Sequence, residues 1–590
     1  MVELRTILPY FRPYAKGLAI GLVCTALANI LQIAAPYLTK LVIDGLTDPD
    51  VTAGRIALLG SLIVLAAGIG GVFRYVMRER LNGISRHIET DLRNDFFRHL
   101  LRLDATFYGT MRTGDLMSRA TNDTSAVRMA AGPAVMYLVN TAVTFVFALA
   151  LMLWISPRLT LFGMIPMIGL PVIVLGFGGV IHRRYEEIQE QFSALSTFVQ
   201  ENLTGVRIVR AYTQEDEQAR QFDGYNEDYR ARNMRLVRTS GMFHPLLGLL
   251  SGVAMVLVLW LGGLEVMAQR ITLGDFVAFS LYLGMLVWPM IALGWVVNLF
   301  QRGEASMGRL NRVLRAQPQV DAPAHPTPLG EVHGEVAFRD VSFTYPGTER
   351  AVLQHVSFVA KPGETVAIVG PTGSGKSTVV ALLARLYDPT QGQITLDGVP
   401  ITALDPAALR AHIGVVPQDP FLFSDSIERN IALGLAAARE GSDPEHSEVV
   451  RRAAGVAQLH EQILAFPHQY TTMLGERGIN LSGGQKQRAT LARALARDPV
   501  VLVLDDALSA VDTHTEAAIL TDLRGAVRGT TAFIISHRVS AVMHADQILV
   551  IEDGHIVERG KHTDLIGADG TYARLLRRQL LEEGLETVLS

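Results

Sequence analysis

The 590-residue sequence contains one cysteine, Cys24, and few charged residues. A single cysteine excludes an internal disulfide framework and a cysteine-based zinc site. Charged residues make up 19% of the chain and the formal net charge is −4, whereas soluble domains hold about 25% charged residues. The slightly acidic balance gives no basic field that would attract nucleic acid. Nucleic acid is therefore not an expected partner, and an ordinary soluble enzyme is disfavoured.

Long apolar runs fill the first 300 residues instead. Six of them lie at about residues 17–38, 56–77, 133–155, 159–181, 242–268 and 273–300. Each run is long enough for the ~20 residues with which a helix crosses a hydrocarbon core. The first run continues past Ala26-Leu27-Ala28, which resembles a leader cleavage site, so a membrane helix is favoured over a signal peptide. The pattern predicts a membrane domain with six spans, and the lipid bilayer is an expected partner.

Arginines are distributed unevenly between these runs. Nine lie between the second and third runs and nine between the fourth and fifth, whereas the short connections hold only Arg55, Arg158 and Arg270. The positive-inside rule places the arginine-rich side in the cytoplasm. We therefore expect a multi-pass protein of the cell (inner) membrane, with both termini and the segment after the last span in the cytoplasm. Residues 1–15 mix arginine and proline with large apolar residues and predict an amphipathic elbow helix at the membrane surface.

The chain changes character after residue 317. Four prolines between residues 318 and 328 end the last helix and predict a stiff linker over residues 318–332. Beyond the linker, short β runs alternate with helical patterns, at residues 335–339, 364–370, 413–417, 500–504, 532–535 and 547–551. This alternation is typical of an α/β domain with a largely parallel sheet. The predicted domains are a membrane domain of residues 1–317, the linker, and an α/β domain of residues 333–590.

A phosphate-binding motif follows the second of these β runs. Residues 370–378 read Gly-Pro-Thr-Gly-Ser-Gly-Lys-Ser-Thr, a complete G-x-x-x-x-G-K-S match between an apolar strand and a helix. The glycines let backbone N–H groups face phosphate oxygens, and the helix start adds a favourable dipole. Lys376 is expected to reach the β- and γ-phosphates, and the Ser377 hydroxyl to bind Mg²⁺. The alternative, a glycine-rich turn without a ligand, is disfavoured by the strand–loop–helix context. The residues predicted to bind ATP are Gly370, Thr372, Gly373, Ser374, Gly375, Lys376, Ser377 and Thr378.

An acidic residue ends another apolar strand. Residues 501–504 are all apolar, and Asp505 follows them. A buried parallel strand would carry Asp505 to the sheet edge that holds the phosphate-binding loop, where a carboxylate binds Mg²⁺ directly or through water. Such a strand is weak evidence by itself, but together with the loop it predicts a site for ATP and Mg²⁺.

Residues 481–485 read Leu-Ser-Gly-Gly-Gln, about 20 residues before Asp505. With the two motifs above, this segment resembles the signature of ATP-binding cassette (ABC) transporters. Six spans ahead of one cassette resemble an exporter half-transporter of the type IV fold over nearly the whole chain. The resemblance implies an all-α membrane domain of six transmembrane helices with long cytoplasmic extensions, followed by an α/β P-loop ATPase domain with a helical subdomain. It also implies which residues contact ATP bound to a second cassette, namely Ser482, Gly483, Gly484 and Gln485.

Other family motifs match single positions or short segments. The resemblance implies that Tyr345 stacks on adenine, that Gln418 senses Mg²⁺ and that His537 contacts the γ-phosphate. It also implies that residues 509–512 communicate between two ATP sites, and that residues 475–478 contact the membrane domain. A lone tyrosine or histidine is more often structural, but the order and spacing of these residues around the two stronger motifs favour function.

One position departs from the family pattern. The residue after Asp505 is normally Glu, the carboxylate that polarises the attacking water, and here it is Asp506. Asp is one methylene shorter, and a misplacement of about 1 Å can cost roughly 10²-fold in rate. Family cassettes pair head to tail, so the departure predicts a heterodimer with a homologous half-transporter. This chain's own site, with Asp506, His537 and Gln418 as its catalytic residues, would hydrolyse ATP slowly, and its signature would complete the partner's site. The alternatives are a homodimeric lipid flippase and an ATP-gated regulatory or channel subunit.

Two further sets of residues bear on transport. Residues 105–115 and 211–217 resemble the segments through which cassette closure drives alternating access in exporters. Polar residues within the spans are candidates for a substrate pocket, although amides also join helices and tryptophan favours membrane interfaces. They are Asn29, Gln32, Tyr137, Asn140, Trp295 and Asn298. Because no span carries a central cluster of charges, the expected substrate is an amphipathic drug, lipid or peptide, exported from the cytoplasm or inner leaflet.

Overall fold

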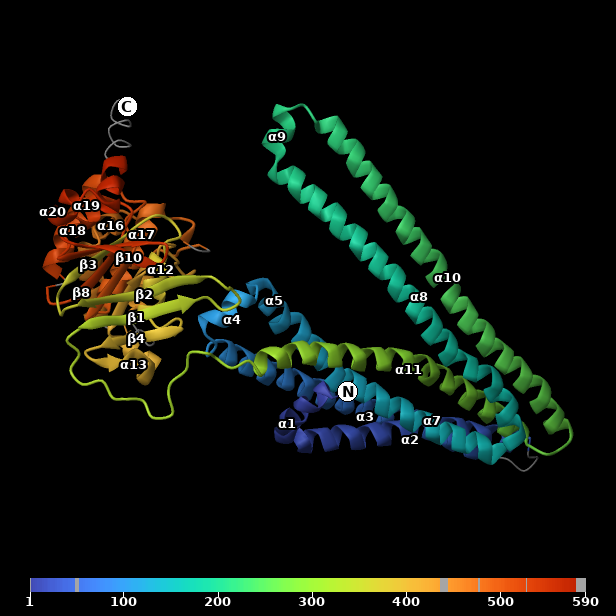
Figure 1. Cartoon of the computed structure of the whole chain (residues 1–590). Helices are drawn as coiled ribbons and strands as arrows, with labels where there is room; N and C mark the ends of the chain where they lie inside the picture. The colour runs from blue at the N-terminus through green and yellow to red at the C-terminus, as the bar shows by residue number, and fades with distance from the viewer. Residues whose placement is uncertain (1, 48–51, 436–443, 476–477, 527, 580–590) are drawn as a thin grey trace. The chain divides into compact units, whose positions relative to one another are not determined.

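The computed structural model describes residues 2–47, 52–435, 444–475, 478–526 and 528–579 (Figure 1). Its contacts divide the chain into two compact units. The first consists of Met1–Arg102 and Arg112–Ala316, and the second of Leu103–Met111 and Gln317–Ser590.

The first unit is built from long helices. Six of its described helical segments are long and apolar enough to cross a membrane, which confirms the predicted spans. Four of these segments are single helices. The first, Glu3–Leu46, also includes the short helical pieces that precede α2, and the third, Thr113–Ile155, is assembled from shorter pieces that begin at α5 (Thr113–Ser118) and end in α7. The main helices are α2 (Ala15–Leu46), α3 (Ala53–Leu100), α7 (Val135–Ile155), α8 (Pro157–Thr204), α10 (Glu215–Met267) and α11 (Leu273–Leu314).

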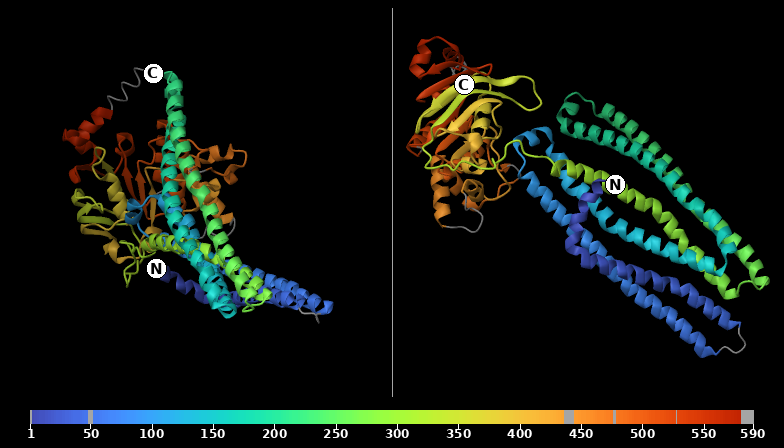
Figure 2. Two further views of the ribbon diagram at one scale, coloured as in Figure 1. Left: turned by 90° about the vertical axis from the view of Figure 1, so that its right-hand side faces the viewer. Right: turned by 60° about the horizontal axis from the view of Figure 1, so that its bottom comes forward.

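These helices pack as antiparallel neighbours. α2 lies along α3, and α8 lies along α10, with the short helix α9 (Val206–Ala211) between the latter two at the tip (Figures 1 and 2). Gly21 allows a close approach of α2 to α3, since a Cβ there would lie 2.7 Å from Leu81, and Gly70 of α3 lies against Leu31. α8 and α10 are 48 and 53 residues long, so each extends well beyond the ~20 residues of a membrane span.

The N-terminal segment is not one continuous helix. It consists of the short turns η1 (Glu3–Ile7), α1 (Leu8–Phe11) and η2 (Arg12–Tyr14), which lead directly into α2. Pro9 and Pro13 lie near the start of α1 and η2, and proline lacks the N–H that a longer helix would need there. The Tyr10 hydroxyl donates a hydrogen bond to Asp95 of α3, which ties these turns to the helix bundle.

The second unit contains two sheets. Five strands of the larger sheet run parallel in the order β9-β3-β8-β7-β6, with β10 antiparallel at the edge beside β9, as the alternating pattern predicts. Its strands are β3 (Thr365–Val369), β6 (Ile413–Val416), β7 (Val501–Asp505), β8 (Thr531–Ile535), β9 (Gln547–Glu552) and β10 (His555–Gly560).

A smaller antiparallel sheet has the strand order β2-β1-β4-β5. Its strands are β1 (Val336–Thr344), β2 (Ala351–Ala360), β4 (Gln391–Leu396) and β5 (Val399–Pro400). The β run predicted at residues 335–339 therefore belongs to this sheet and not to the parallel one. Both sheets contribute to one apolar core, in which Phe358 of β2 lies against Phe533 of β8.

A cluster of helices forms the predicted helical subdomain. α14, α15 and α17 pack on one another around a second apolar core that includes Leu422, Ile431 and Leu491. The helices of the second unit are α4 (Ala105–Thr110), α12 (Lys376–Leu383), α13 (Pro406–Ala411), α14 (Ile427–Ala432), α15 (Pro444–Val456), α16 (His460–Leu464), α17 (Gly483–Ala496), α18 (Thr513–Ala526), α19 (Val539–Val542) and α20 (His562–Gly567).

Candidate ATP site

The carboxyl ends of four neighbouring parallel strands form one edge of the larger sheet. The phosphate-binding loop follows β3, His537 follows β8, Asp505 ends β7, and Gln418 follows β6. These segments surround a cavity of about 310 Å³. It is lined by Val352, Gly370, Thr372, Gly373, Gly375, Lys376, Ser377, Thr378, Gln418, Asp505, Asp506, Ile535 and His537. Parallel topology therefore brings together Gly370 and His537, which lie 167 positions apart in the sequence.

The phosphate-binding loop requires glycine at two positions. Gly370 has φ +153°, and a Cβ there would collide with the Ile551 carbonyl oxygen. Gly375 has φ +102°, and a Cβ there would lie 2.9 Å from the Val352 carbonyl oxygen. Without side chains at these points, the loop packs tightly and α12 begins directly at Lys376. This arrangement presents the helix start to the cavity, as phosphate binding requires.

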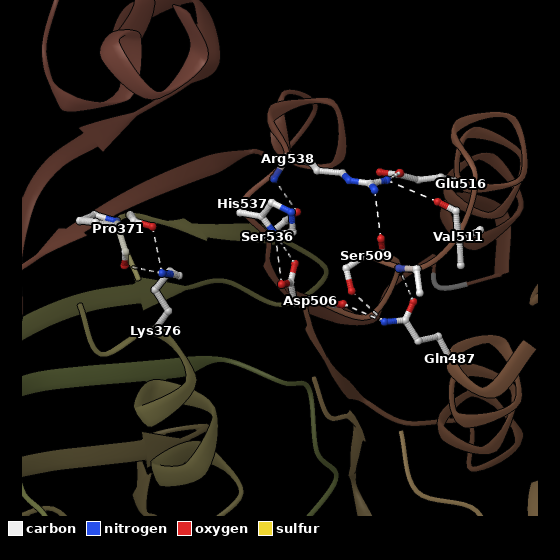
Figure 3. Close-up of polar contacts among 12 residues, drawn as sticks. Pro371, Lys376, Gln487, Asp506, Ser509, Val511, Glu516, Ser536, His537 and Arg538 are labelled. Atoms are coloured by element: carbon white, nitrogen blue, oxygen red, sulfur yellow. Dashed lines mark hydrogen bonds and ion pairs between the residues drawn. The ribbon is translucent and has the colours of Figure 1, made fainter. Parts of the chain in front are cut away.

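Lys376 folds back over its own loop. Its Nζ donates hydrogen bonds to the carbonyl oxygens of Gly370, at 2.9 Å, and Pro371, at 2.7 Å (Figure 3). Burial lowers the pKa of the Lys376 ammonium, and the nearby carboxylates of Asp506 and Asp505 oppose that shift. The hydrogen-bond acceptors of the Lys376 side chain are thus backbone carbonyl oxygens of its own loop, which phosphate oxygens can replace.

The loop and the end of β7 fit ATP and Mg²⁺ chemically. The Ser374 hydroxyl is buried inside the loop and has no hydrogen-bond partner among the described residues, so an acceptor for it is missing. Ser377 donates to Asp505. Burial, aided by the nearby Asp506 carboxylate, raises the pKa of Asp505, although the Ser377 hydrogen bond and Lys376 oppose that shift. A hydroxyl oxygen beside a carboxylate is a suitable ligand pair for Mg²⁺, which would supply positive charge to the phosphates of ATP.

Asp506 and His537 form a direct pair. The His537 Nδ1 lies 2.8 Å and 3.0 Å from the two carboxylate oxygens of Asp506 (Figure 3). Asp506 has a left-handed backbone, with φ +51°, and its N–H donates to the Ile535 carbonyl at 2.9 Å. The sequence reasoning treats the two side chains separately, whereas the structure shows that they share one hydrogen-bonded position. The positive φ, uncommon for a residue other than glycine, turns Asp506 toward the histidine.

A buried network holds the loop that follows Asp506, and sequence reasoning missed it. Gln487 of α17, only 3% exposed, accepts from the Ala510 N–H at 2.9 Å and donates to the Ser509 hydroxyl at 2.9 Å. From the other side, Arg538 donates to the Ser509 carbonyl at 3.0 Å and pairs with Glu516 at 2.7 Å (Figure 3). Gln487 lies two residues after the signature, and Arg538 follows His537. This proximity to motifs is the one feature of the sequence that could have indicated the two residues as members of the network.

The signature residues lie away from this cavity. Ser482 caps the start of α17, since its hydroxyl accepts the Gln485 N–H at 3.3 Å and the Gln485 side chain accepts the Ser482 N–H at 2.9 Å. None of residues 482–485 is among the residues that line the phosphate cavity. Within one chain, the structure therefore does not bring the signature to the phosphate-binding loop.

Tyr345 lies beside the site without lining the cavity. Its hydroxyl is 3.1 Å from the Thr378 hydroxyl, and its ring makes edge-on contacts with Phe343 and Tyr387. Of the segment 475–478, Glu476 and Arg477 lie outside the described residues.

The polar residues of the spans have different surroundings. Asn29 is buried, and its side chain accepts a hydrogen bond from Thr144 of α7 at 2.8 Å, so it joins two helices. Gln32 accepts from Arg74 of α3 at 2.8 Å. Tyr137 and Trp295 make an edge-to-face pair with centroids 4.9 Å apart. The remaining two residues, Asn140 and Asn298, lie on α7 and α11.

The two predicted coupling segments differ in their surroundings. Asp104 caps α4 and also accepts hydrogen bonds from the N–H groups of Gln319, at 2.6 Å, and Val320, at 2.9 Å. These bonds connect α4 to the segment that follows α11. In the other segment, Tyr212 follows α9 and is 74% exposed.

A phosphate-binding loop with an adjoining Mg²⁺ site, carried on one chain with six membrane-length helices, defines an ATP-driven membrane transport protein. Comparison with known proteins agrees with this class. Residues 18–290 match the family described as ABC transporter transmembrane region, and residues 353–509 match the family described as ABC transporter. The chain belongs to the ABC transporter family.

Full-length relatives have the same architecture. The chain is 39% identical to the multidrug resistance-like ATP-binding protein MdlA of Escherichia coli over 98% of its length and 96% of that protein. It is 35% identical to the ATP-dependent lipid A-core flippase of Aromatoleum aromaticum over 98% and 96%. A solved structure of a bacterial Atm1-family ABC exporter with ATP bound is similar, with a TM-score of 0.78 and 28% identity over 96% of this chain and 99% of that one. The exporter fold expected from the motifs is confirmed.

Proposed function

We propose that the chain is one subunit of a heterodimeric exporter that moves amphipathic drugs, lipids or peptides out of the cytoplasm or inner leaflet. In this proposal the chain is an ATP hydrolase coupled to transport by alternating access. It lies in the cell (inner) membrane, with both termini and the ATPase domain in the cytoplasm. The predicted residues of the phosphate-binding loop hold ATP, while Ser377, Gln418 and Asp505 hold Mg²⁺, and Tyr345 supports the adenine.

One observation is the main support for the proposed heterodimer. Asp506 occupies the position at which the family pattern has Glu, and both of its carboxylate oxygens lie within hydrogen-bonding distance of His537. A carboxylate that is one methylene short and engaged with the histidine is poorly placed to polarise a water at the γ-phosphate. The signature and the phosphate-binding loop are both intact, so this chain is suited to complete a faster site on a partner cassette while its own site is slow.

A homodimeric lipid flippase is the second candidate. It is supported by the 35% identity to a lipid A-core flippase and would need Asp506 to suffice for turnover. The subunit composition of the active transporter distinguishes the heterodimeric exporter from the homodimeric flippase. We expect the full chain, reconstituted alone in vesicles, to show little substrate-stimulated ATP hydrolysis, and to gain it when combined with a half-transporter that carries Glu at this position. A stable dimer of this chain alone with ordinary stimulated turnover would refute the heterodimer.

Tyr212 provides a test of coupling. We expect Tyr212→Ala to leave equilibrium ATP binding unchanged and to abolish the stimulation of hydrolysis by substrate, because the exposed ring after α9 is the group available for contact with a cassette. Tyr185→Ala is a matched control, since this tyrosine is also exposed and lies on α8 away from the tip. Unchanged transport by the Tyr212 variant would rule out this contact.

A further inference from the structure

We propose that Arg74, held by Gln32, binds the anionic headgroup of an amphipathic substrate within the membrane-spanning part of the chain. This inference rests on the proposed export function and narrows its substrate class to amphiphiles that carry a carboxylate, phosphate or similar group. It concerns the surface formed by α2 and α3, which lie side by side (Figures 1 and 2).

The packing of α2 on α3 places Arg74 at the level of the hydrocarbon. Gly70 of α3 lies against Leu31 and Ala28 of α2, and Gly21 of α2 lies against Leu81 of α3. Arg74 therefore lies between these two contacts, beside the middle of the apolar run at residues 17–38. The sequence hides this position, because Arg74 stands near the end of its own apolar run and resembles a flanking residue.

Charge compensation sets Arg74 apart from the other charges of the apolar runs. Besides Arg74, the six runs contain two carboxylates, Glu265 and Asp275. Glu265 pairs with Arg158 and Arg270 at 3.3 Å and 2.5 Å. Asp275 pairs with Lys40 at 2.6 Å. In the described part of the chain, Arg74 has a neutral amide as its partner and no carboxylate. An arginine within a span normally pairs or faces a polar cavity, and it marks a functional site by default.

The direction of the side chain argues against a simple membrane anchor. Gln32 lies on the side of Arg74 that faces the connection between α2 and α3, and the Arg74 Nη2 donates to its Oε1 at 2.8 Å. An anchoring arginine would extend the other way, toward the polar end marked by Arg78 and Arg80, as long cationic side chains do at membrane interfaces. The guanidinium is instead held along the apolar run by Gln32.

The free face of this pair suits an amphipathic anion. A guanidinium has five N–H donors in a planar fork that matches carboxylate and phosphate oxygens, and one contact with Gln32 leaves most of them available. The pair lies at the level of an apolar run, so an anion that reaches it must be carried on an apolar body. The headgroup of such an amphiphile would compensate the charge of Arg74, whereas a neutral amphiphile would leave the guanidinium uncompensated.

Photolabelling of the full chain tests this assignment. The chain is placed in phosphatidylcholine nanodiscs and labelled with a 16-carbon alkyl sulfonate bearing a mid-chain diazirine, or with the neutral alcohol of the same tail. We expect the sulfonate to label peptides of α2 and α3 about tenfold more than the alcohol, as one charge-assisted contact provides. Arg74→Gln should abolish this preference, Arg74→Lys should retain part of it and Gln32→Leu should weaken it. Arg78→Gln, which alters a neighbouring exposed arginine, should leave it intact.

Equal preference in the wild type and in Arg74→Gln would overturn the proposal, as would loss of preference in Arg78→Gln. Competitors identify the source of the anion. Labelling should fall with added dodecyl phosphate and persist when part of the phosphatidylcholine is replaced by phosphatidylglycerol. Displacement by phosphatidylglycerol would overturn the assignment to a transported substrate. Labelling needs neither ATP hydrolysis nor a second subunit, so its failure is distinct from failure of the heterodimer proposal.

Discussion

Replacing Asp506 by Glu is expected to raise ATP hydrolysis by the purified full chain about 10²-fold, the factor that a misplacement of about 1 Å can cost. The longer side chain would extend the carboxylate past His537, which now lies 2.8 Å from one of the Asp506 oxygens. The measurement is phosphate release from Mg-ATP in detergent or nanodiscs, at saturating ATP.

Two controls give this experiment its meaning. Lys376→Ala combined with Asp506→Glu should remove the gained activity, because Lys376 belongs to the phosphate-binding loop. ATP affinity should be the same in the wild type and in Asp506→Glu, since the added methylene does not touch that loop. Robust wild-type activity would contradict a slow site and make the homodimeric exporter the leading interpretation. Activity absent from both proteins would leave the heterodimer standing, because a single chain need not dimerise.

Loss of Arg538 should destabilise the cassette strongly. Glu516 is buried, with its side chain 4% exposed, and Arg538 pairs with one of its oxygens at 2.7 Å. The other oxygen has no hydrogen-bond partner among the described residues. Arg538→Met would leave this buried carboxylate unpaired, which typically costs about 3–5 kcal/mol. For a domain of this size the melting midpoint should fall by roughly 10 °C.

The comparison variants isolate the buried charge as the cause. Arg538→Met with Glu516→Leu should recover much of the lost stability, because the double variant removes the unpaired carboxylate. Arg350→Met removes an arginine that pairs with Asp553, but both side chains are 84% exposed, so the midpoint should hardly move. Thermal unfolding followed by intrinsic fluorescence is sufficient. A double variant no more stable than Arg538→Met would show that the ion pair is not the source of the effect.

Local patterns explain what the sequence predicted well. Membrane-length apolar runs, the Gly-Lys-Ser loop and the apolar strand before Asp505 each need only a few consecutive residues, and the structure contains all of them in the expected elements. The features that the sequence did not predict depend on the register between segments that are distant along the chain. The sequence of residues 335–339 is compatible with a strand of either sheet. Their pairing with β2 and β4 assigns them to the antiparallel sheet.

The same limit applies within the candidate site. Asp506 and His537 are 31 positions apart, and they meet because β7 pairs in parallel with β8, with Asp505 opposite Ile535. Gln487 contacts the 509–510 segment only because α17 packs where it does. The position of Arg74 along α2 likewise follows from the offset between α2 and α3, at which Gly21 allows a close contact with Leu81. The sequence shows which residues are available for such contacts, but it does not show how far one strand or helix is shifted along its neighbour, which decides which residues meet.

The cap at Ser482 fixes the polarity of the surface at the start of α17. Its oxygen already receives the Gln485 N–H, while the Gln485 side chain is occupied with the Ser482 N–H. The hydroxyl proton is then the part of Ser482 left to face outward, and the first N–H groups of α17 point the same way, as at any helix start. The start of α17 thus presents hydrogen-bond donors, and it favours a negatively charged ligand that is rich in hydrogen-bond acceptors. It would reject a cation even if the shape were right.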